Sequence, residues 1–586
     1  MFYLGINYYG HNTSCALVKD GKLIYASEEE RFSRKKNDGS LPLKSIKNCL
    51  KTFNLTINDI DQIYAATVPH RLIKEKYFKY TANQFPKAYD LFFDKKSINN
   101  LKYLVNIEEK IKKKLNFKKK IKFVNHHYCH LASAHFLSGF KDSCCVSIDG
   151  LGEIESVAIG QANGNKIKLI NSVDFPHSLG MFYSAITHFL GFKAMSSEGT
   201  VMALATFGNF NEKISNQKST YYKKIKEMIS IKKNLKIQID LSWFNFPFTM
   251  QGWVSDKFIK YFGKPRKEGS KISKHHKNIA AALQKVFEEI YIEIIIQASK
   301  KIKSKNLTLS GGCALNCKAN GLILSNTKFK DIYIQPASHD AGLAIGAAYL
   351  GYLSKNRINN KNFQRFDHTY FGPEYSLQQI KKTLIKIGLK FEKLQNSSLD
   401  CANKLKNGKV VGWFQGKMEF GPRALGNRSI LSAPYPNNKK NYINNKIKHR
   451  ENFRPFAPAI LEEKISTYYK INIRSPFMLI ATFLKNQRYR KKIEATLHND
   501  LSARVQTVSL KNNIKFYKVI NNFYKITGVP VVLNTSFNDK GEPMVCSHID
   551  ALKSFYKTNL DYLYLEDYLI ENSRYNLNKI KNFYKL

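Results

Sequence analysis

The feature that most limits how this chain can fold is a recurring succession of short apolar runs and glycine-rich polar turns in its first half. Runs of β-type residues occur at 2–8, 22–27, 144–149 and 156–161. The turns beside them include Lys19-Asp-Gly-Lys22, a hairpin signal, and Asp149-Gly-Leu-Gly-Glu153. Small residues in such turns let a ligand approach the backbone N–H groups. The pattern therefore predicts an α/β fold whose sheets present phosphate-binding loops.

A further strand and turn follow a long helix. Apolar residues recur at helical spacing from 277 to 303, a strand is expected at 307–309, and Ser310-Gly-Gly-Cys-Ala-Leu-Asn316 comes next. A strand that leads through two glycines into a helix can cradle a phosphate or nucleotide, although most such turns only end strands. The polar, aperiodic stretch 355–368 predicts a domain boundary, because 586 residues exceed one ordinary domain.

Histidine is concentrated in the stretch 124–135, which holds four of the chain's fifteen. On a helix, His126 and His130 would lie one turn apart on the same face, close enough to share a cation. A carboxylate would complete a two-histidine, one-carboxylate set with open coordination positions. Asp340, in a polar turn between two apolar runs, is the candidate. The spacing also fits packed or surface histidines, so by itself it leaves both interpretations open.

Four basic polar segments lie beside strand-like runs in the second half, at 415–429, 446–456, 501–507 and 533–543. Guanidinium and ammonium groups bind phosphate oxygens strongly. Several converging ones predict a polyphosphate substrate, ATP together with a second phosphorylated compound. The alternative is that these side chains form exposed salt bridges on loops.

The net charge of +49 invites a nucleic-acid interpretation. The excess is mostly lysine, distributed over the whole length and interleaved with Asn and Ile, which favours a compositional bias instead. The first residues lack the basic region of a signal peptide, and no apolar run approaches the length of a membrane span. The nine cysteines are scattered. We therefore expect a cytoplasmic protein with free thiols and no membrane association.

Six longer motifs follow one another along the chain. The first half has HHxxHxxSA at 126–134, SGGxALN at 310–316 and HDAG at 339–342. The second half has MEFGPRALGNRS at 418–429, KxRExFRPF at 448–456 and NTSFNxxGEP at 534–543. Over nearly its whole length the sequence resembles the O-carbamoyltransferases of the NodU, TobZ and CmcH type, which carbamoylate nodulation-factor sugars and antibiotics.

The resemblance implies a two-domain α/β enzyme. Residues 1–355 would form a two-lobed actin-like (ASKHA) domain similar to TsaD, and residues 366–586 a YrdC-like α/β domain. In that family the C-terminal domain makes carbamoyl-adenylate from ATP and carbamoyl phosphate, and the N-terminal domain transfers the carbamoyl group to an acceptor hydroxyl. ATP and carbamoyl phosphate are thus the expected substrates, with Mg²⁺ a candidate companion of ATP.

For the first domain, the resemblance implies a metal site with His126, His130 and Asp340 as ligands. Iron(II) is the expected ion, with other divalent ions as alternatives, and it would stabilise charge on the leaving adenylate phosphate. His11 would be the general base toward the acceptor hydroxyl, a role that suits an imidazole near neutral pH. The residues expected to line the nucleotide are Gly311, Gly312 and Asn316.

For the second domain, the resemblance implies a group of cations that aligns phosphates and neutralises their charge. Its expected members are Arg423, Lys448, Arg454 and Arg504, with Lys417, Arg450, Asn534 and Ser536 as neighbours. Met478 matches a family residue near the adenylating site, and its alternative role is core packing.

Three positions depart from the family pattern. Asn12 replaces the Asp that follows the N-terminal His, which removes a charge beside His11 and puts the orientation of this base in question. Thr200 replaces the Lys of an E-G-K-x-M motif, so a contact to nucleotide or phosphate is in question. Lys540 stands where Arg is common.

The expected acceptor is a small hydroxyl compound, a sugar or natural product. A homodimer is compatible with the sequence, and nucleic acid is not the expected partner. The alternative is a tRNA-modifying transferase of the threonylcarbamoyl type, since the same two domain types serve that reaction and the charge would suit tRNA. A third hypothesis is a non-catalytic actin-fold binding module. The fused domains and the second-half motifs favour the carbamoyltransferase.

Overall fold

The computed structural model describes residues 1–89, 94–215, 217–249, 252–358 and 363–585. They divide into a first unit of Met1–Ile24 and Gly39–Arg365, and a second unit of Tyr25–Asp38 and Phe366–Leu586. Tyr25–Asp38 therefore groups with the second unit, although it lies within the range expected for the first domain. Residues 359–362, inside the expected boundary at 355–368, lie outside the described residues.

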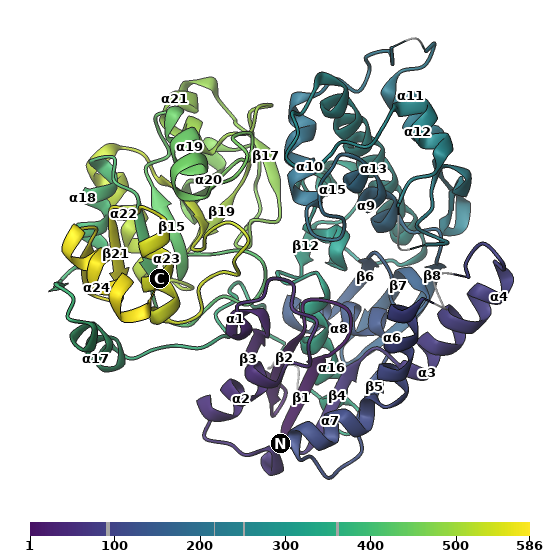
Figure 1. Cartoon of the computed structure of the whole chain (residues 1–586), viewed down its shortest axis with the longest axis horizontal. Helices are drawn as coiled ribbons and strands as arrows, with labels where there is room; N and C mark the ends of the chain where they lie inside the picture. The colour runs from purple at the N-terminus through teal and green to yellow at the C-terminus, as the bar shows by residue number, and fades with distance from the viewer. Residues whose placement is uncertain (90–93, 216, 250–251, 359–362, 586) are drawn as a thin grey trace. The chain divides into compact units, whose positions relative to one another are not determined.

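Two sheets of the same topology organise the first unit (Figure 1). Their strand orders are β3-β2-β1-β4-β5 and β12-β11-β6-β7-β8. In each, the first strand along the chain pairs antiparallel with the next strand and parallel with a later one. The duplication confirms the expected two-lobed, actin-like α/β arrangement. The strands are β1 (Phe2–Asn7), β2 (Ser14–Lys19), β3 (Lys22–Glu28), β4 (Gln62–Ala66), β5 (Lys122–Val124), β6 (Asp142–Ile148), β7 (Glu155–Asn163), β8 (Lys166–Asp174), β11 (Asn306–Ser310) and β12 (Asp331–Ile334).

Two helices, α8 (His126–Ser138) and α16 (Leu343–Leu353), pack against each other between these sheets. α16 lies on β1 and β2, and α8 lies on β6 and β11. Glycine permits the contact of α16 with β1, because a Cβ at Gly5 would come within 1.9 Å of the Ala344 oxygen. It also permits the contact of α16 with α8, because a Cβ at Gly346 would come within 1.9 Å of the Cys129 oxygen. The close packing brings the start of α8 and the turn before α16 together, and the site is built there.

The other helices of the first unit surround this core (Figure 1). They include α2 (Leu43–Thr52), α3 (Pro69–Leu72), α6 (Lys95–Val105), α7 (Ile107–Leu115), α9 (Leu179–Phe189), α10 (Glu198–Leu204), α11 (Tyr221–Glu227), α12 (Asp256–Phe262), α13 (Lys274–Lys301), α14 (Cys317–Gly321) and α15 (Ile323–Asn326). α13 confirms the helix expected at 277–303 and begins at Lys274, after Ser273, whose hydroxyl caps it. The hairpin turn at 19–22 joins β2 to β3. The sequence pattern indicates no strand between the runs 2–8 and 22–27, so β2 is an additional strand.

The second unit is built on a mixed eight-stranded sheet of order β13-β22-β21-β14-β15-β20-β16-β19. These strands are β13 (Glu392–Lys393), β14 (Val411–Phe414), β15 (Arg428–Ser432), β16 (Ala457–Leu461), β19 (Gln506–Val508), β20 (Val531–Ser536), β21 (Tyr562–Leu565) and β22 (Tyr568–Glu571). A two-stranded sheet pairs β17 (Ala481–Phe483) with β18 (Ser502–Arg504). The second unit is therefore of the α/β class, and its sheet contains both parallel and antiparallel pairs of strands.

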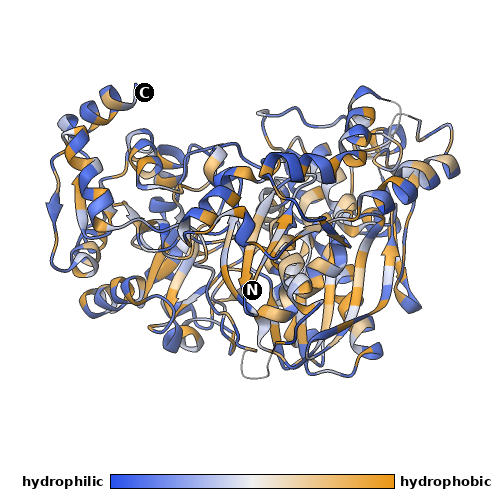
Figure 2. Ribbon diagram, turned by 90° about the horizontal axis from the view of Figure 1, so that it is seen from below, coloured by the Kyte–Doolittle hydropathy of each residue, from blue (hydrophilic) through white to orange (hydrophobic). Residues whose placement is uncertain are grey.

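Two apolar cores cover the faces of this sheet, because successive strand side chains point to opposite sides. On β14, Val411 and Trp413 belong to one core and Phe414 to the other. α18 (Ser397–Lys406) and α22 (Ile514–Thr527) contribute to the first core; α17 (Leu377–Ile387), α23 (His548–Lys557) and α24 (Arg574–Tyr584) contribute to the second. Figure 2 shows hydrophobic residues along the strands and hydrophilic ones along the outer helices.

None of the described helices is long and apolar enough to cross a membrane.

His135 on α8 predicts a pH-dependent stability for the first unit. Its Nδ1 hydrogen-bonds Ser143 Oγ at 2.9 Å and its Nε2 the Gly164 oxygen at 3.0 Å, and burial lowers the pKa of the imidazole to about 4. The unfolded chain takes up the proton first as the pH falls, so this stabilisation is present above pH ~6.5 and is lost toward pH 4.

His135→Gln should therefore flatten the pH profile of the unfolding free energy. Between pH 4 and 6.5 the slope should fall by up to about 1.4 kcal/mol per pH unit. Denaturant unfolding of both proteins across this range measures the difference. A slope that is the same in the variant contradicts the prediction.

Candidate functional site

The start of α8 places the two histidines of the expected metal site. Asn125 caps the helix by accepting the Tyr128 N–H at 2.9 Å, and Gly139 ends it in the left-handed conformation. The buried Glu153 carboxylate accepts the His126 N–H at 3.1 Å and so places a negative charge at the helix N-terminus. The helix therefore starts at His126, and His130 follows one turn later on the same face.

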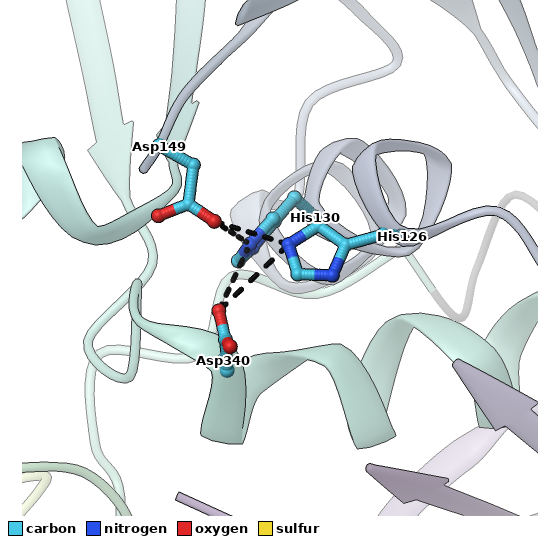
Figure 3. A group of neighbouring side chains, drawn as sticks. All are labelled: His126, His130, Asp149 and Asp340. Atoms are coloured by element: carbon cyan, nitrogen blue, oxygen red, sulfur yellow. Dashed lines mark hydrogen bonds and ion pairs between the residues drawn. The ribbon is translucent and has the colours of Figure 1, made fainter. Parts of the chain in front are cut away.

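Four side chains converge beside α8 (Figure 3). The Nε2 atoms of His126 and His130 lie 3.0 and 3.3 Å from Asp149 Oδ2, and 3.8 and 3.7 Å from Asp340 Oδ1. Ligand atoms of all four residues lie within 4.8 Å of one another. The structure thus brings together the three expected ligands, and it adds Asp149.

Asp149 was not anticipated as a ligand. It follows the end of β6, and its second oxygen, Oδ1, accepts the Gly312 N–H at 2.8 Å. The sequence signal is the acidic residue that opens the glycine-rich turn 149–153. Because that turn is far from the histidines in sequence, only the pairing of β6 with β11 and its contact with α8 places it beside them.

The electrostatics of the cluster favour charged carboxylates. Burial opposes ionisation of Asp149, but the hydrogen bonds and charges of His126 and His130 outweigh it and hold the pKa of this carboxyl well below its ordinary value. Burial likewise disfavours the His126 imidazolium, yet Asp149 and Asp340 raise the pKa of His126 to about 9. The two carboxylates thus place negative charge against the imidazole nitrogens. A proton on His126 neutralises part of this charge, and a bound cation would neutralise it in the place of the proton.

The donor set fits a divalent metal ion. Two imidazole nitrogens and two carboxylates form a mixed nitrogen and oxygen set typical of first-row transition metals. His127 lies between the two ligands in sequence but serves the fold, since it hydrogen-bonds Ser147 Oγ and the Glu155 oxygen at 3.0 and 2.9 Å. The four residues His126, His130, Asp149 and Asp340 could therefore hold a metal.

His11 lies beside this cluster, in the loop between β1 and β2. Its Nδ1 is 2.7 Å from Asn12 Oδ1 and 3.8 Å from Asp340 Oδ2, and the side chain is 32% exposed. The Asn12 oxygen can only accept a hydrogen bond, so Nδ1 carries the proton and the Nε2 lone pair remains available. Asn7 donates to the backbone oxygens of both residues and fixes the loop. Asn12, which stands where the family pattern has Asp, therefore still orients His11, and it does so through a neutral amide.

The glycine turn after β11 packs directly on the end of β6. A Cβ at Gly311 would lie 2.3 Å from the Ile148 oxygen, and the φ of 84° also favours glycine. The Gly312 N–H is donated to Asp149. Asn316 caps α14 through the Ala319 N–H and also hydrogen-bonds Gln284. These residues thus adjoin the metal ligands, and Gly312 helps to hold Asp149 in place.

Basic residues gather in the second unit as the sequence predicts. Burial and the charges of Arg454, Arg504 and Arg423 hold the pKa of Arg450 well below its ordinary value. Arg454 is affected in the same way, with Glu451 opposing the shift. Guanidinium groups remain charged at neutral pH, so their mutual repulsion is relieved when an anion binds. This arginine cluster (Arg423, Arg450, Arg454 and Arg504) suits a phosphate-bearing ligand.

Lys448 lies next to the arginine cluster, but its ammonium group is engaged by the protein. Nζ donates to the Ser536 oxygen at 2.9 Å, the Asn538 oxygen at 2.6 Å and Asn538 Oδ1 at 2.7 Å. Ser536 Oγ donates to Asn538 Oδ1, and Asn534 Nδ2 donates to the Ala424 oxygen. Lys448 therefore holds the loop after β20 and adds positive charge nearby.

The remaining expected residues lie in different surroundings. Lys417 is exposed, and its charge acts on His368, which lines a pocket with Tyr370 and Asn513. Met478 is buried with a φ of 56°, a left-handed backbone that costs a residue with a Cβ roughly 1–2 kcal/mol. Thr200 is buried in α10, and Lys540 is exposed.

Two family models match the chain. The model described as carbamoyltransferase N-terminus matches residues 3–349, and the one described as carbamoyltransferase C-terminus matches residues 402–572.

Similar proteins cover nearly the whole chain. An uncharacterized protein of Synechocystis, sll1178, is 35% identical over 97% of this chain and 96% of its own length. Nodulation protein NolNO of Sinorhizobium fredii is 33% identical over 96% of this chain and 79% of its own. Among solved structures, T. kodakarensis HypF is 14% identical with a TM-score of 0.30 over 60% of this chain and 48% of its own, a likeness too weak to support an argument.

Proposed function

Because the chain belongs to the carbamoyltransferase family, we propose that it is an ATP-dependent O-carbamoyltransferase that works through carbamoyl-adenylate. The observation that carries the proposal is the position of His11 beside the convergent His126, His130, Asp149 and Asp340. A base next to a group of metal-type ligands suits removal of a proton from an acceptor hydroxyl close to a phosphate leaving group. The arginine cluster supports the first half of the reaction.

The proposed reaction has three steps. Carbamoyl phosphate loses phosphate to water and leaves carbamate. A carbamate oxygen attacks the α-phosphorus of ATP, and pyrophosphate leaves, which gives carbamoyl-adenylate. The acceptor hydroxyl then attacks the carbamoyl carbon, AMP leaves, and the hydroxyl proton is taken up by a base.

In the second unit, the arginine cluster would bind the phosphate oxygens and neutralise the charge of the pyrophosphate that leaves. Phosphoryl and nucleotidyl transfer depend mainly on such alignment and charge stabilisation. Lys448 would hold the loop after β20 in position for this binding, since its three hydrogen bonds hold Ser536 and Asn538.

In the first unit, His11 Nε2 would accept the proton of the acceptor hydroxyl while Asn12 holds the opposite side of the ring. A divalent ion, iron(II) by resemblance, held by His126, His130, Asp149 and Asp340 would supply Lewis-acid neutralisation of the leaving phosphate. The acceptor is proposed to be a small hydroxyl compound, a sugar or a natural product.

The first test is the partial reaction. Labelled pyrophosphate should be exchanged into ATP only when carbamoyl phosphate is present, and Arg423→Ala should abolish this exchange, because it removes one member of the arginine cluster. Arg488→Ala, an exposed arginine of the same unit, is the matched control and should exchange at the wild-type rate. Exchange that does not require carbamoyl phosphate contradicts the proposal.

A second test identifies the acceptor. The protein is incubated with ATP, carbamoyl phosphate and a metabolite extract, and products heavier by one carbamoyl group are sought by mass spectrometry. Products that form only with all components present support O-transfer to a small molecule.

The net charge of +49 favours one other candidate, a carbamoyl-type transferase acting on tRNA. Such an enzyme should shift tRNA in a gel at low salt and release it as the salt concentration rises. Absence of binding at low salt removes this candidate.

A further inference from the structure

The segment Tyr25–Asp38 is the part of the second unit that comes from the beginning of the chain. It contains the end of β3 and a short helical turn, α1 (Glu30–Ser33), and its sequence is rich in charge. Four of the charged residues are at most 6% exposed: Glu28, Glu29, Glu30 and Arg31. Buried charged groups cost stability unless they are paired, so their contacts need an explanation.

Arg31 and Glu28 hold one residue of the GPRALG motif. The Gly421 N–H donates to Glu28 Oε1 at 3.1 Å, and the Gly421 oxygen accepts from Arg31 Nη2 at 2.8 Å. Arg31 also pairs with Glu28 at 2.9 Å and with Glu30 at 2.8 Å. Gly421 has a φ of 112°, which favours glycine, so both polar groups of this backbone position are fixed by the segment.

Arg34 holds a second loop. Its Nη1 donates to the Met544 oxygen at 2.7 Å and its Nη2 to the Pro543 oxygen at 2.8 Å. Its Nε lies 3.7 Å from Asp550 Oδ1. The guanidinium group is thus fastened to the end of the NTSFNxxGEP motif.

Both loops lie next to the anion site, by which we mean the arginine cluster together with Lys448 and the loop after β20. Gly421 lies two positions before Arg423 of the arginine cluster, and the far side of the same loop is held by Glu419, whose Oε1 accepts the Leu425 and Asn427 N–H groups at 2.8 Å each. Met544 is followed by Val545, whose N–H donates to the Phe537 oxygen at 2.9 Å and closes the loop after β20, which contains Asn538.

The segment also contributes charge. Burial and the nearby Arg450 and Arg454 lower the pKa of the Lys448 ammonium, and the positive charge of Lys36 adds to this shift. Lys36 therefore lies near the same anion site and adds to its positive potential.

We propose that Tyr25–Asp38 is a positioning element of the adenylate-forming site, with Arg31 and Arg34 setting the separation of the loop that carries Arg423 from the loop after β20. This inference rests on the proposed function. It assigns to the start of the chain a role in the partial reaction that the sequence motifs place entirely in the second half. A purely structural role would stabilise the second unit without affecting how it binds phosphates.

The test is Arg34→Met, since this guanidinium group is only partly buried and its loss leaves the Glu28–Arg31 pair intact. Carbamoyl-phosphate-dependent exchange of pyrophosphate into ATP should show a KM for pyrophosphate raised about 10- to 100-fold, because misplacement of a binding group by an ångström has effects of this size. Direct titration with inorganic pyrophosphate should weaken in parallel. Arg34→Lys should recover part of the affinity, since an ammonium group can still donate to one of the two carbonyls.

The matched control is Arg266→Met in the first unit. Arg266 is more deeply buried than Arg34, and its guanidinium group likewise donates to backbone oxygens, including those of Leu190, Gly191 and Ser270. This variant should lose stability and keep the wild-type KM. If folded Arg34→Met also keeps the wild-type KM and pyrophosphate affinity, the inference is overturned. If Arg34→Met does not fold, Arg31→Lys decides on the same readouts.

Failure of the proposed function has a different signature. The wild-type protein would then show no exchange dependent on carbamoyl phosphate, whereas pyrophosphate titration of the wild type and Arg34→Met would still compare the geometry of the anion site.

Discussion

Replacing Asp149 with asparagine is expected to remove metal binding and stop carbamoyl transfer, while exchange of pyrophosphate into ATP continues at the wild-type rate. Asp149 Oδ2 is the oxygen nearest to both imidazoles, at 3.0 and 3.3 Å, so its charge dominates the cluster. An amide keeps the shape and the acceptor for Gly312 but loses the negative charge that a divalent ion requires.

The size of the effect follows from the ligand role. Loss of an outer-shell partner alone costs about 10- to 100-fold in metal affinity or activity, so loss of a ligand should cost at least about 100-fold. Metal content per chain, measured by elemental mass spectrometry after reconstitution with Fe(II), is the readout that needs no acceptor. Carbamoylated product formed in the extract assay reports transfer.

Asp142→Asn is the matched control for this variant. Asp142 lies at the opposite end of the same strand, β6, where it is exposed and accepts a hydrogen bond from Ser304. It should bind metal and transfer carbamoyl like the wild type. If Asp149→Asn retains the full metal content, Asp149 is not a ligand; if it loses exchange as well as transfer, the division of the two steps between the units is wrong.

The largest stability effect is expected for Arg428→Met. Arg428 is fully buried, and its guanidinium group stacks 3.6 Å from the Phe414 ring. It donates to five backbone oxygens, those of Cys546, Gln415, Asn427, Pro373 and Gly416. Methionine fills the volume but removes all five hydrogen bonds. The Asn427 and Pro373 oxygens keep the N–H donors of Gln415 and Met418, and each buried acceptor left without a donor costs about 1–3 kcal/mol before relaxation.

After relaxation we expect the second unit to lose about 3–5 kcal/mol, which is a large part of the stability of a typical domain. Hydrogen–deuterium exchange in increasing denaturant follows β14 and β15 separately from the first unit. Arg488→Met removes an exposed arginine from the same unit and should change stability by no more than about 0.5 kcal/mol. If Arg428→Met also changed the free energy of unfolding by no more than about 0.5 kcal/mol, the structural role of Arg428 would be contradicted.

Arg428 also shows where the sequence pattern misleads. It lies in the segment 415–429, which was expected to bind phosphate, and a basic residue in such a loop looks like a phosphate ligand. Its five hydrogen bonds to carbonyls show that this charge organises the loop, while Arg423 joins the arginine cluster. Local sequence cannot distinguish the two uses, because both need a guanidinium group next to glycines.

The sequence by itself determined what depends on local spacing and residue type. It predicted the pairing of His126 with His130 on the condition that their stretch is helical, the glycine turn at Gly311, the α/β class and the basic second half, because periodicity and side-chain chemistry are local properties. The tertiary structure decided what depends on contacts between distant segments. Asp149 lies in the candidate metal cluster because β6 ends beside α8, and the buried charges of Tyr25–Asp38 pair with Gly421, nearly four hundred residues away. Such pairings are set by the packing of whole sheets and helices, which short-range patterns do not encode.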